Sequence, residues 1–213
     1  APITDAGSVL GMVALAERDG AEDRFTPSDV ARMGTMVDQL APTLRKAMLH
    51  ERIEYEARHD SLTSLPNRAS FERLVDSAIA KLESVPADDD ITGDEELTVV
   101  IMMDLDRFKE VNDTLGHHAG DTLLIDFARR LRSALGPDDV LARLAGDEFA
   151  VLCRRSVDGM HQLAGTLVNE ARRPFSIDDL EIVVTVSIGV APIVGELKDS
   201  SWWLRRADIA MYA

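Results

Sequence analysis

Two adjacent carboxylates, Asp147 and Glu148, follow an Ala-Gly step in the stretch RLAGDEFAVL at residues 143–152. Apolar residues stand on both sides of this step, which predicts two short strands joined by a tight turn with the acids at its tip. Carboxylates held this close repel each other unless a cation or a hydrogen-bond donor lies nearby. The pattern therefore predicts such a group at the tip.

A further acid, Asp104, ends the near-continuous apolar run LTVVIMMD at residues 97–104. Such a run is typical of a central strand that is buried on both faces. If this strand neighbours the hairpin in one sheet, Asp104 and Asp147 converge and form the oxygen-rich arrangement that Mg²⁺ prefers. A magnesium site in turn implies phosphate chemistry.

The segment between these acids, DLDRFKEVNDTLGHHAGD at residues 104–121, supplies further polar groups. Lys109 offers a positive charge, and the two glycines of the segment allow a backbone to approach closely. Asn112 and Asp121 provide an amide and a carboxylate, which together can match the hydrogen-bonding edge of a guanine. These two residues and Asp113 are equally well explained as turn and N-cap residues, and both interpretations stay open.

Composition limits the classes of partner. The 213 residues are 46% hydrophobic and 29% charged, enough for one core and a smaller appendage. The net charge of -15 argues against nucleic acid as a partner, because phosphate backbones need basic faces, whereas a small nucleotide is not excluded. We expect no membrane contact and no signal peptide, because no apolar run approaches about 18 residues. The single cysteine, Cys153, fits a core position in a cytoplasmic protein.

Periodicity predicts an α/β domain from about residue 60 onward. The expected elements are helices near 67–83, 124–135, 158–172 and 207–212, and strands at 97–104, within 143–152 and at 182–191. Their order, βααββαβ, indicates one mixed sheet covered by helices, close to a ferredoxin-like plan.

The N-terminal segment follows a different pattern. Residues 8–16 predict a strand, and Thr26, Pro27 and Asp29 form a capping-box-like start of a long connector helix. Apolar residues then form a short heptad seam at Val30, Met33, Val37, Leu40 and Leu44. This seam fits either pairing with a second copy of the chain or packing on the chain's own strand. Pro42 is expected to kink a long coiled coil.

Five motifs resemble, in order and spacing, the GGDEF family of diguanylate cyclases. They are DSLTSLPNR (60–68), DLDRFKEVNDTLGHHAGD (104–121), RLAGDEF (143–149), VSIGVA (186–191) and ADIAMY (207–212). The resemblance implies a palm-type α/β domain over residues 51–213 that condenses two GTP molecules into cyclic di-GMP and pyrophosphate, with Mg²⁺ or Mn²⁺ as cofactor. It also implies that catalysis requires a homodimer with the two domains facing each other antiparallel.

Carried over position by position, the resemblance implies a role for most of the residues above. The metal ligands are the carboxylates of Asp104 and Asp147 and the backbone carbonyl of Leu105. Asp147 is also the general base, Lys109 stabilises the phosphates, and Glu148 belongs to the same catalytic group. The implied contacts to the nucleotide are Phe108, Asn112, His117, Asp121 and Gly146.

The sequence departs from the family pattern at two positions. Ala145 stands where the family signature begins with glycine, and alanine is costly there only if the backbone needs a positive φ. Gly136 stands where many members carry the arginine of a product-inhibition motif, although its aspartate is kept as Asp139. Weak or absent feedback inhibition is the expected consequence. The alternative function is a degenerate domain that binds GTP without turnover and regulates a neighbouring domain, such as an EAL phosphodiesterase.

Residues 1–50 are similar to the closing strand and last helix of a GAF sensory domain. The likeness lies in the stretch GSVLGMVALAERDGAEDRFTPSDVARMGTMVDQLAPTLRKAMLHER. It implies the end of a sensory domain and a helix that transmits dimer geometry to the cyclase domain, without indicating a sensory ligand.

Overall fold

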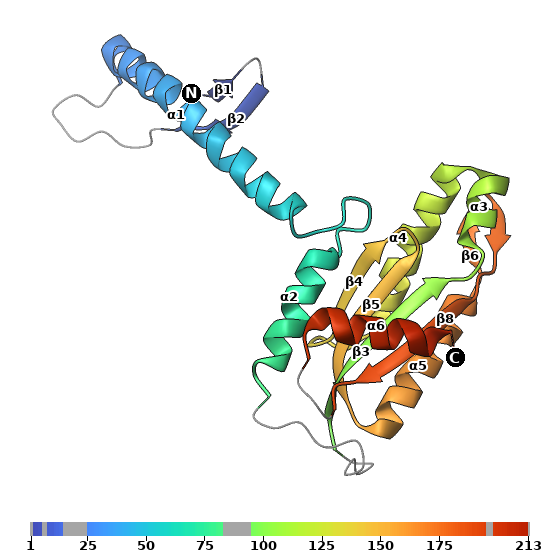
Figure 1. The fold of residues 1–213 in the computed structure, drawn as a ribbon. Helices are drawn as coiled ribbons and strands as arrows, with labels where there is room; N and C mark the ends of the chain where they lie inside the picture. The colour runs from blue at the N-terminus through green and yellow to red at the C-terminus, as the bar shows by residue number, and fades with distance from the viewer. Residues whose placement is uncertain (1, 6–7, 15–24, 83–94, 195–197, 213) are drawn as a thin grey trace. The chain divides into compact units, whose positions relative to one another are not determined.

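The computed structural model describes residues 2–5, 8–14, 25–82, 95–194 and 198–212 (Figure 1). The chain divides into two compact units, residues 1–57 and 58–213, and the boundary follows the long helix α1 (Pro27–Glu56). Among the described helices, none has the length and apolar character needed to cross a membrane.

The first unit consists of a two-stranded hairpin and helix α1. Strand β1 (Pro2–Asp5) pairs antiparallel with β2 (Ser8–Met12), so the expected strand is confirmed over its first part, while residues 15–16 lie outside the described segments. The capping box is confirmed, because the backbone N–H of Asp29 donates to Oγ1 of Thr26 and the Thr26 N–H donates to Oδ2 of Asp29.

Helix α1 buries only a small part of its apolar surface within its own unit. Val37 and Ala41 pack with Ile3 of the hairpin, which supports packing of the seam on the chain's own strand. The helix continues through Pro42 as one element. Met33 of the seam is partly buried against the same cluster. Exposed large apolar side chains of α1 include Val30, Met36, Leu40, Leu44, Met48, Leu49 and Ile53.

The second unit is built on a four-stranded sheet in the order β4-β5-β3-β8. The strands are β3 (Leu97–Leu105), β4 (Val140–Ala145), β5 (Glu148–Arg155) and β8 (Val186–Pro192). Every neighbouring pair is antiparallel, so the expectation of a mixed sheet was wrong. The reason is the connectivity, because the β4–β5 hairpin reverses the chain before β5 pairs with β3.

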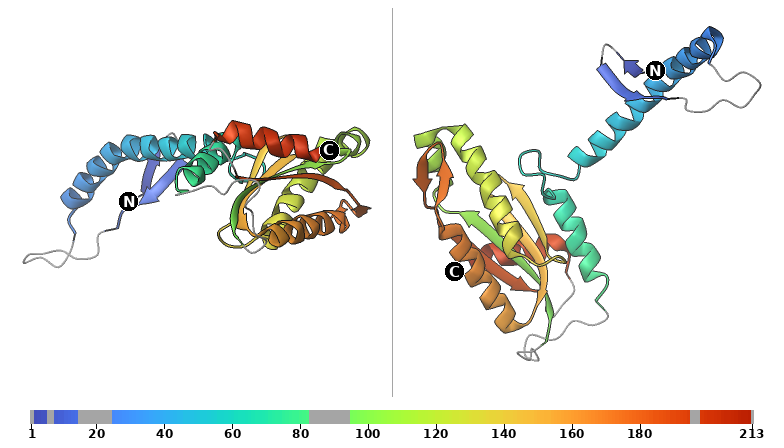
Figure 2. Two further views of the ribbon diagram at one scale, coloured as in Figure 1. Left: turned by 60° about the horizontal axis from the view of Figure 1, so that its bottom comes forward. Right: turned by 180° about the vertical axis from the view of Figure 1, so that it is seen from behind.

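Helices cover both faces of this sheet (Figure 2). One face carries α4 (His117–Ala134) and α5 (Val157–Arg172), and the other carries α2 (Arg68–Ile79) and α6 (Ser200–Met211). A short helix α3 (Phe108–Leu115) follows β3, and a small hairpin of β6 (Phe175–Ile177) and β7 (Leu180–Ile182) precedes β8. The single strand expected at 182–191 is therefore two elements. The order βααββαβ of the main sheet and its helices confirms the ferredoxin-like, palm-type plan.

Strand β3 is the centre of the core. Successive side chains point to opposite faces, so Ile101 and Met103 pack under α4 and α5 while Val100 and Met102 pack under α2 and α6. All four are at most 3% exposed, which explains why the strand has a continuous apolar run rather than an alternating one. Cys153 is buried in the same core, as predicted.

Candidate functional site

The predicted acids meet at the end of the two central strands. Asp104 pairs directly with Glu148 in the β3–β5 ladder, and the backbone N–H of Leu105 donates to the carbonyl of Asp147 at 3.4 Å. The hairpin tip is therefore bound to the end of β3. The structure brings together all four groups for which metal binding or catalysis was inferred at these strands.

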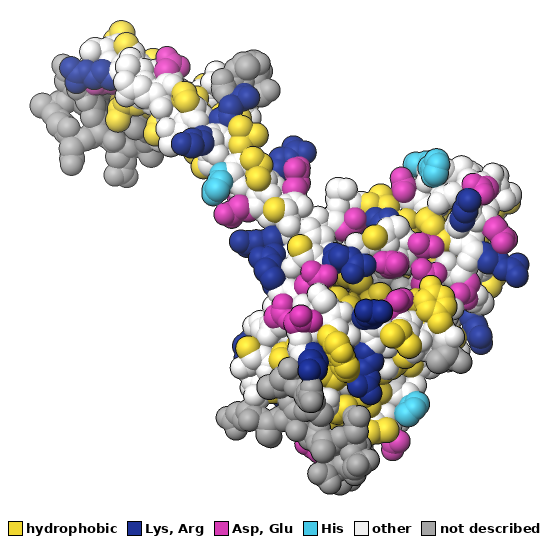
Figure 3. Space-filling model, in the orientation of Figure 1, with side chains coloured by type: hydrophobic (Ala, Val, Ile, Leu, Met, Phe, Trp, Pro, Cys, Tyr) yellow, Lys and Arg dark blue, Asp and Glu magenta, His cyan; other side chains and the backbone are white. Residues whose placement is uncertain are grey.

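The electrostatics of this cluster are those of a cation site. Burial, then the negative charges of Asp147, Glu148, Asp106 and Asp208, raise the pKa of Asp104 to about 6. On the face of the second unit that α6 crosses, acidic side chains gather together with basic ones (Figure 3). A divalent ion beside these carboxylates would offset their repulsion.

The donor set fits magnesium or manganese. The described residues contain no ready-made cluster of three or more His, Cys, Asp or Glu side chains. Mg²⁺ is commonly held by one or two carboxylates, with water and substrate phosphates completing its shell, rather than by an all-protein cage. The carboxylates of Asp104 and Asp147 and the carbonyl of Leu105 match that pattern.

A fourth acid of the cluster, Asp106, was not recognised from the sequence and makes hydrogen bonds within the fold. Its Oδ2 accepts a hydrogen bond from the Thr185 hydroxyl at 2.5 Å, and its Oδ1 accepts one from the Ser187 hydroxyl at 2.7 Å. Its own backbone N–H donates to the Thr185 carbonyl. These bonds fasten the end of β3 to β8 just before Arg107, which has a left-handed backbone (φ 59°). Both carboxylate oxygens of Asp106 are therefore engaged within the fold, which distinguishes it from Asp104 and Asp147, the carboxylates inferred from the sequence as metal ligands.

The hairpin tip resolves the question raised by Ala145. Gly146 has the positive φ, 50°, whereas Ala145 is not among the residues with positive φ. Ala145 is exposed and pairs with Glu148 across the turn. Alanine in place of the usual glycine therefore carries no left-handed strain at this position.

Two ion pairs hold the hairpin, and sequence reasoning missed both. Arg143 donates to the Gly146 carbonyl and to the Asp60 carboxylate, each at 2.8 Å, and its side chain is 11% exposed. Burial alone would raise the pKa of Asp60, but hydrogen bonds from Thr63 and Arg143 outweigh it and hold that pKa below its usual value. Arg68, the first residue of α2, pairs with Glu148 at 3.0 Å. The signal was present, since Asp60 and Arg68 lie in DSLTSLPNR.

Four of the inferred nucleotide contacts lie on the neighbouring helices α3 and α4, as does Lys109, whereas the fifth, Gly146, lies at the hairpin tip. Phe108 is buried in the core, while Lys109, His117 and Asp121 are exposed and Asn112 is partly buried. The N-cap interpretation of the polar residues is wrong, because the N-caps of α3 and α4 are Arg107 and Gly116, and neither makes a side-chain cap bond. Asn112 and Asp121 instead stand inside their helices, available for another purpose.

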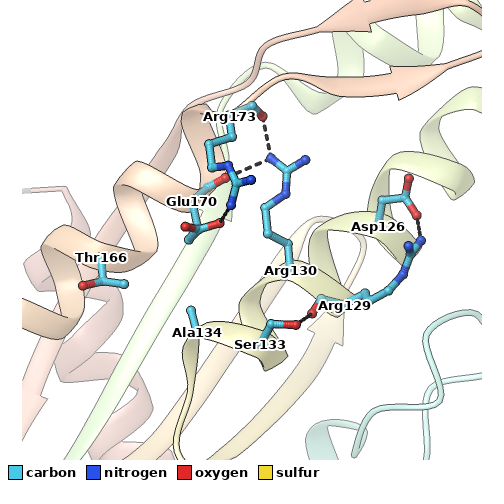
Figure 4. Close-up of a pocket in the computed structure, with 8 residues that line it drawn as sticks. All are labelled: Asp126, Arg129, Arg130, Ser133, Ala134, Thr166, Glu170 and Arg173. Atoms are coloured by element: carbon cyan, nitrogen blue, oxygen red, sulfur yellow. Dashed lines mark hydrogen bonds and ion pairs between the residues drawn. The ribbon is translucent and has the colours of Figure 1, made fainter.

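One pocket of the second unit lies next to the acids and another lies away from them. The nearer, of about 280 Å³, is lined by Arg68, Glu72, Met102, Glu148, Ser201, Leu204, Arg205 and Asp208. The other, of about 500 Å³, lies between α4 and α5 (Figure 4). There Arg130 donates to the backbone carbonyls of Glu170, Arg173 and Pro174 and stacks over Phe175, so it ties the two helices and β6 together.

Comparison with known proteins identifies the class. Residues 57–213 match the family described as diguanylate cyclase, GGDEF domain, so the chain belongs to the GGDEF family. It is 40% identical over 163 residues to the diguanylate cyclase TpbB of Pseudomonas aeruginosa, covering 75% of this chain and 35% of TpbB. It is 39% identical over 163 residues to the cyclic di-GMP phosphodiesterase PdeR of Escherichia coli, covering 76% of this chain and 23% of PdeR. The chain thus spans about a third or less of these curated relatives.

Solved structures agree on the fold. The GGDEF domain of TpbB superposes with a TM-score of 0.61 at 39% identity, covering 72% of this chain and 86% of that one. The coiled coil and GGDEF domain of DgcB from Caulobacter crescentus, determined in complex with c-di-GMP, gives a TM-score of 0.68 at 25% identity, covering 86% of this chain and 93% of that one.

Proposed function

We propose that this chain is an active diguanylate cyclase, which condenses two GTP molecules into cyclic di-GMP and two pyrophosphates. The observation that carries the proposal is the convergence of Asp104, Leu105 and Asp147 at the ends of β3 and the β4–β5 hairpin. Membership of the GGDEF family, with diguanylate cyclases among its relatives, supports it.

The residues of the site divide the work of the reaction. Asp104, Asp147 and the Leu105 carbonyl would hold Mg²⁺ or Mn²⁺, and such an ion would lower the pKa of the attacking 3′-hydroxyl and neutralise charge on the leaving pyrophosphate. Asp147 accepts the proton of the 3′-hydroxyl. The oxygen of that hydroxyl then forms a bond to the α-phosphorus of the facing nucleotide, while the bond from this phosphorus to pyrophosphate breaks. Lys109 stabilises the phosphate charge, and Glu148 lies beside the same metal site.

Nucleotide binding falls to the side of the site formed by α3, α4 and the hairpin tip. The proposed contacts are Phe108, Asn112, His117, Asp121 and Gly146. Because each domain binds one GTP and the product has two identical linkages, a homodimer facing itself antiparallel is needed. Most of the protein's contribution is then positioning and electrostatics.

The test is to incubate the chain with GTP and Mg²⁺ and to measure the formation of cyclic di-GMP by chromatography. We expect product from the unsubstituted chain and none from Asp147→Ala, whereas Asp138→Ala, which removes an exposed acid away from the site, retains activity. Mg²⁺-dependent GTP binding without product in the unsubstituted chain would establish the alternative, a domain that binds GTP and regulates a neighbour. The binding measurement is needed because the relative PdeR, to which this chain is similar, is a cyclic di-GMP phosphodiesterase.

We expect little product inhibition at the position of the family's usual motif. The Asp139 side chain is 3% exposed, pairs with Arg155 and accepts from the Gly136 N–H at 2.8 Å, so it is occupied within the fold. Added cyclic di-GMP should leave the initial rate of product formation nearly unchanged. Strong inhibition of the unsubstituted chain that Asp139→Asn abolishes would contradict this.

We also propose that residues 1–50 end a GAF-like sensory domain and that residues 51–213 form the cyclase domain in the cytoplasm. An antiparallel hairpin followed by a long helix supports the first part. The exposed apolar side chains of α1, among them Leu40 and Leu44, supply a surface through which two copies could pair.

A further inference from the structure

Glycine at position 120 has an unusual neighbour. Gly120 lies in the first turns of α4 and is buried, and a Cβ at this position would stand 2.0 Å from Oδ1 of Asn112 and 3.2 Å from Cζ of Phe108. The amide of Asn112, on α3, therefore occupies the space that any other side chain at position 120 would fill. Gly34 and Gly165, also helical, have no atom within 4 Å of the corresponding point.

A glycine inside a helix lowers the stability of the helix, so its presence at position 120 needs a structural reason. Glycine is about 1 kcal/mol less favourable than alanine in a helix interior. The φ of Gly120 is not among the positive values, so its backbone could accept alanine. Alanine would displace mainly the flexible Asn112 amide, which can rotate away without moving the helix, and would also press against the Phe108 ring, whose Cζ lies 3.2 Å away.

We propose that Gly120 is a specificity-determining residue for the nucleotide base, because its missing Cβ leaves the space in which the Asn112 amide lies against α4, the helix that also carries Asp121. This inference rests on the proposed binding of GTP at α3 and α4. Guanine offers a carbonyl acceptor next to N–H donors, so an amide and a carboxylate held on these two packed helices can address both, whereas adenine lacks the carbonyl. A binding site that uses such fixed polar groups discriminates strongly against a base that leaves them unpaired.

The consequence of Gly120→Ala is a loss of selectivity with the fold retained. We expect the Kd for a non-hydrolysable GTP analogue and the KM for GTP to rise by about tenfold or more. The kcat should change far less, because Asp104 and Asp147 lie on other elements. The preference for the GTP analogue over the matching ATP analogue should fall by a similar factor.

The decisive measurement is a double-mutant cycle by calorimetry on the full chain. Gly120→Ala should weaken binding of the GTP analogue in the wild-type background but add little in an Asn112→Ala background, because the displaced amide is then already absent. Gly165→Ala, a helical glycine with open space, is the matched control and should bind normally. Unchanged binding by Gly120→Ala, or an equal loss in both backgrounds, overturns the inference.

Binding and turnover separate this inference from the proposed function. A chain that binds the GTP analogue selectively but forms no cyclic di-GMP would refute the cyclase proposal while the cycle still decides the role of Gly120. A chain that forms cyclic di-GMP with an unchanged Gly120→Ala variant would refute only the role of Gly120. Absence of any GTP binding would refute both.

Discussion

Asp104→Asn is expected to abolish cyclic di-GMP formation while making the metal-free chain more stable. The raised pKa of Asp104, about 6 against roughly 3.9 in an unfolded chain, means that the folded state binds the proton more tightly. Its ionisation therefore lowers stability as the pH rises from about 4 to about 6, and the full penalty applies above that range. Discounted for solvent screening, the penalty is about 1 to 2 kcal/mol.

Thermal unfolding at two pH values checks this. At pH 7.5 the Tm of Asp104→Asn should exceed that of the unsubstituted chain by roughly 2 to 8 °C for a domain of this size. At pH 4 the two values should approach each other. Added Mn²⁺ should raise the Tm of the unsubstituted chain and have much less effect on the variant. Asp138→Asn is the control, and a lower Tm for Asp104→Asn at pH 7.5 would contradict the repulsion argument.

Gly189→Ala is expected to cause the largest loss of stability of any single methyl addition considered. Helix α6 crosses β8 so closely that a Cβ at Gly189 would lie 1.9 Å from the carbonyl oxygen of Ala207 and 2.6 Å from the backbone nitrogen of Met211. Both atoms are backbone, so the helix must move as a unit. We expect a loss of about 3 kcal/mol or more, the upper part of the range for overpacking, and a Tm lower by roughly 6 to 12 °C.

Denaturant unfolding and calorimetry would measure this effect. Gly165→Ala should be neutral or slightly stabilising, because the added methyl meets open space in a helix. Because α6 carries Asp208, whose charge acts on Asp104, a displaced helix should also reduce turnover. A Tm for Gly189→Ala within the range of Gly165→Ala would show that α6 can shift at little cost.

Features with a strong local signal could be predicted from the sequence. Strand β3 is buried on both faces and therefore has an apolar run, and its pairing with β5 confirmed that Asp104 and the hairpin acids converge. The capping box at Thr26 was also predicted from the sequence and is confirmed. The direction of a strand has no such local signal, which is why the prediction of a mixed sheet was wrong. Strand β1 was not predicted, because its four residues are too few to show a period.

The parts of the site that escaped prediction depend on distant partners. Arg143 and Asp60 are 83 positions apart, and Asp106 meets Thr185 and Ser187 about 80 positions later. A single charged residue has the same local pattern whether it lies in solvent or within such a contact. A close approach at Gly120 was expected from the sequence, but the group that approaches was not: it is the Asn112 side chain, which lies where a Cβ would stand.

The end of β3 and the start of β5, which carry Asp104 and Glu148 with Asp147 in the adjoining turn, bear on how such a domain can be controlled. Strands β3 and β5 are the two inner strands of the sheet, with neighbours on both sides, and inner strands open to hydrogen exchange only when the whole domain unfolds. The spacing of the carboxylates is thus as durable as the fold itself, and a signal could alter it only at the expense of global stability. Under the proposed function, we expect control to act on what reaches the carboxylates, by presenting or withholding the second nucleotide, rather than on the carboxylates themselves.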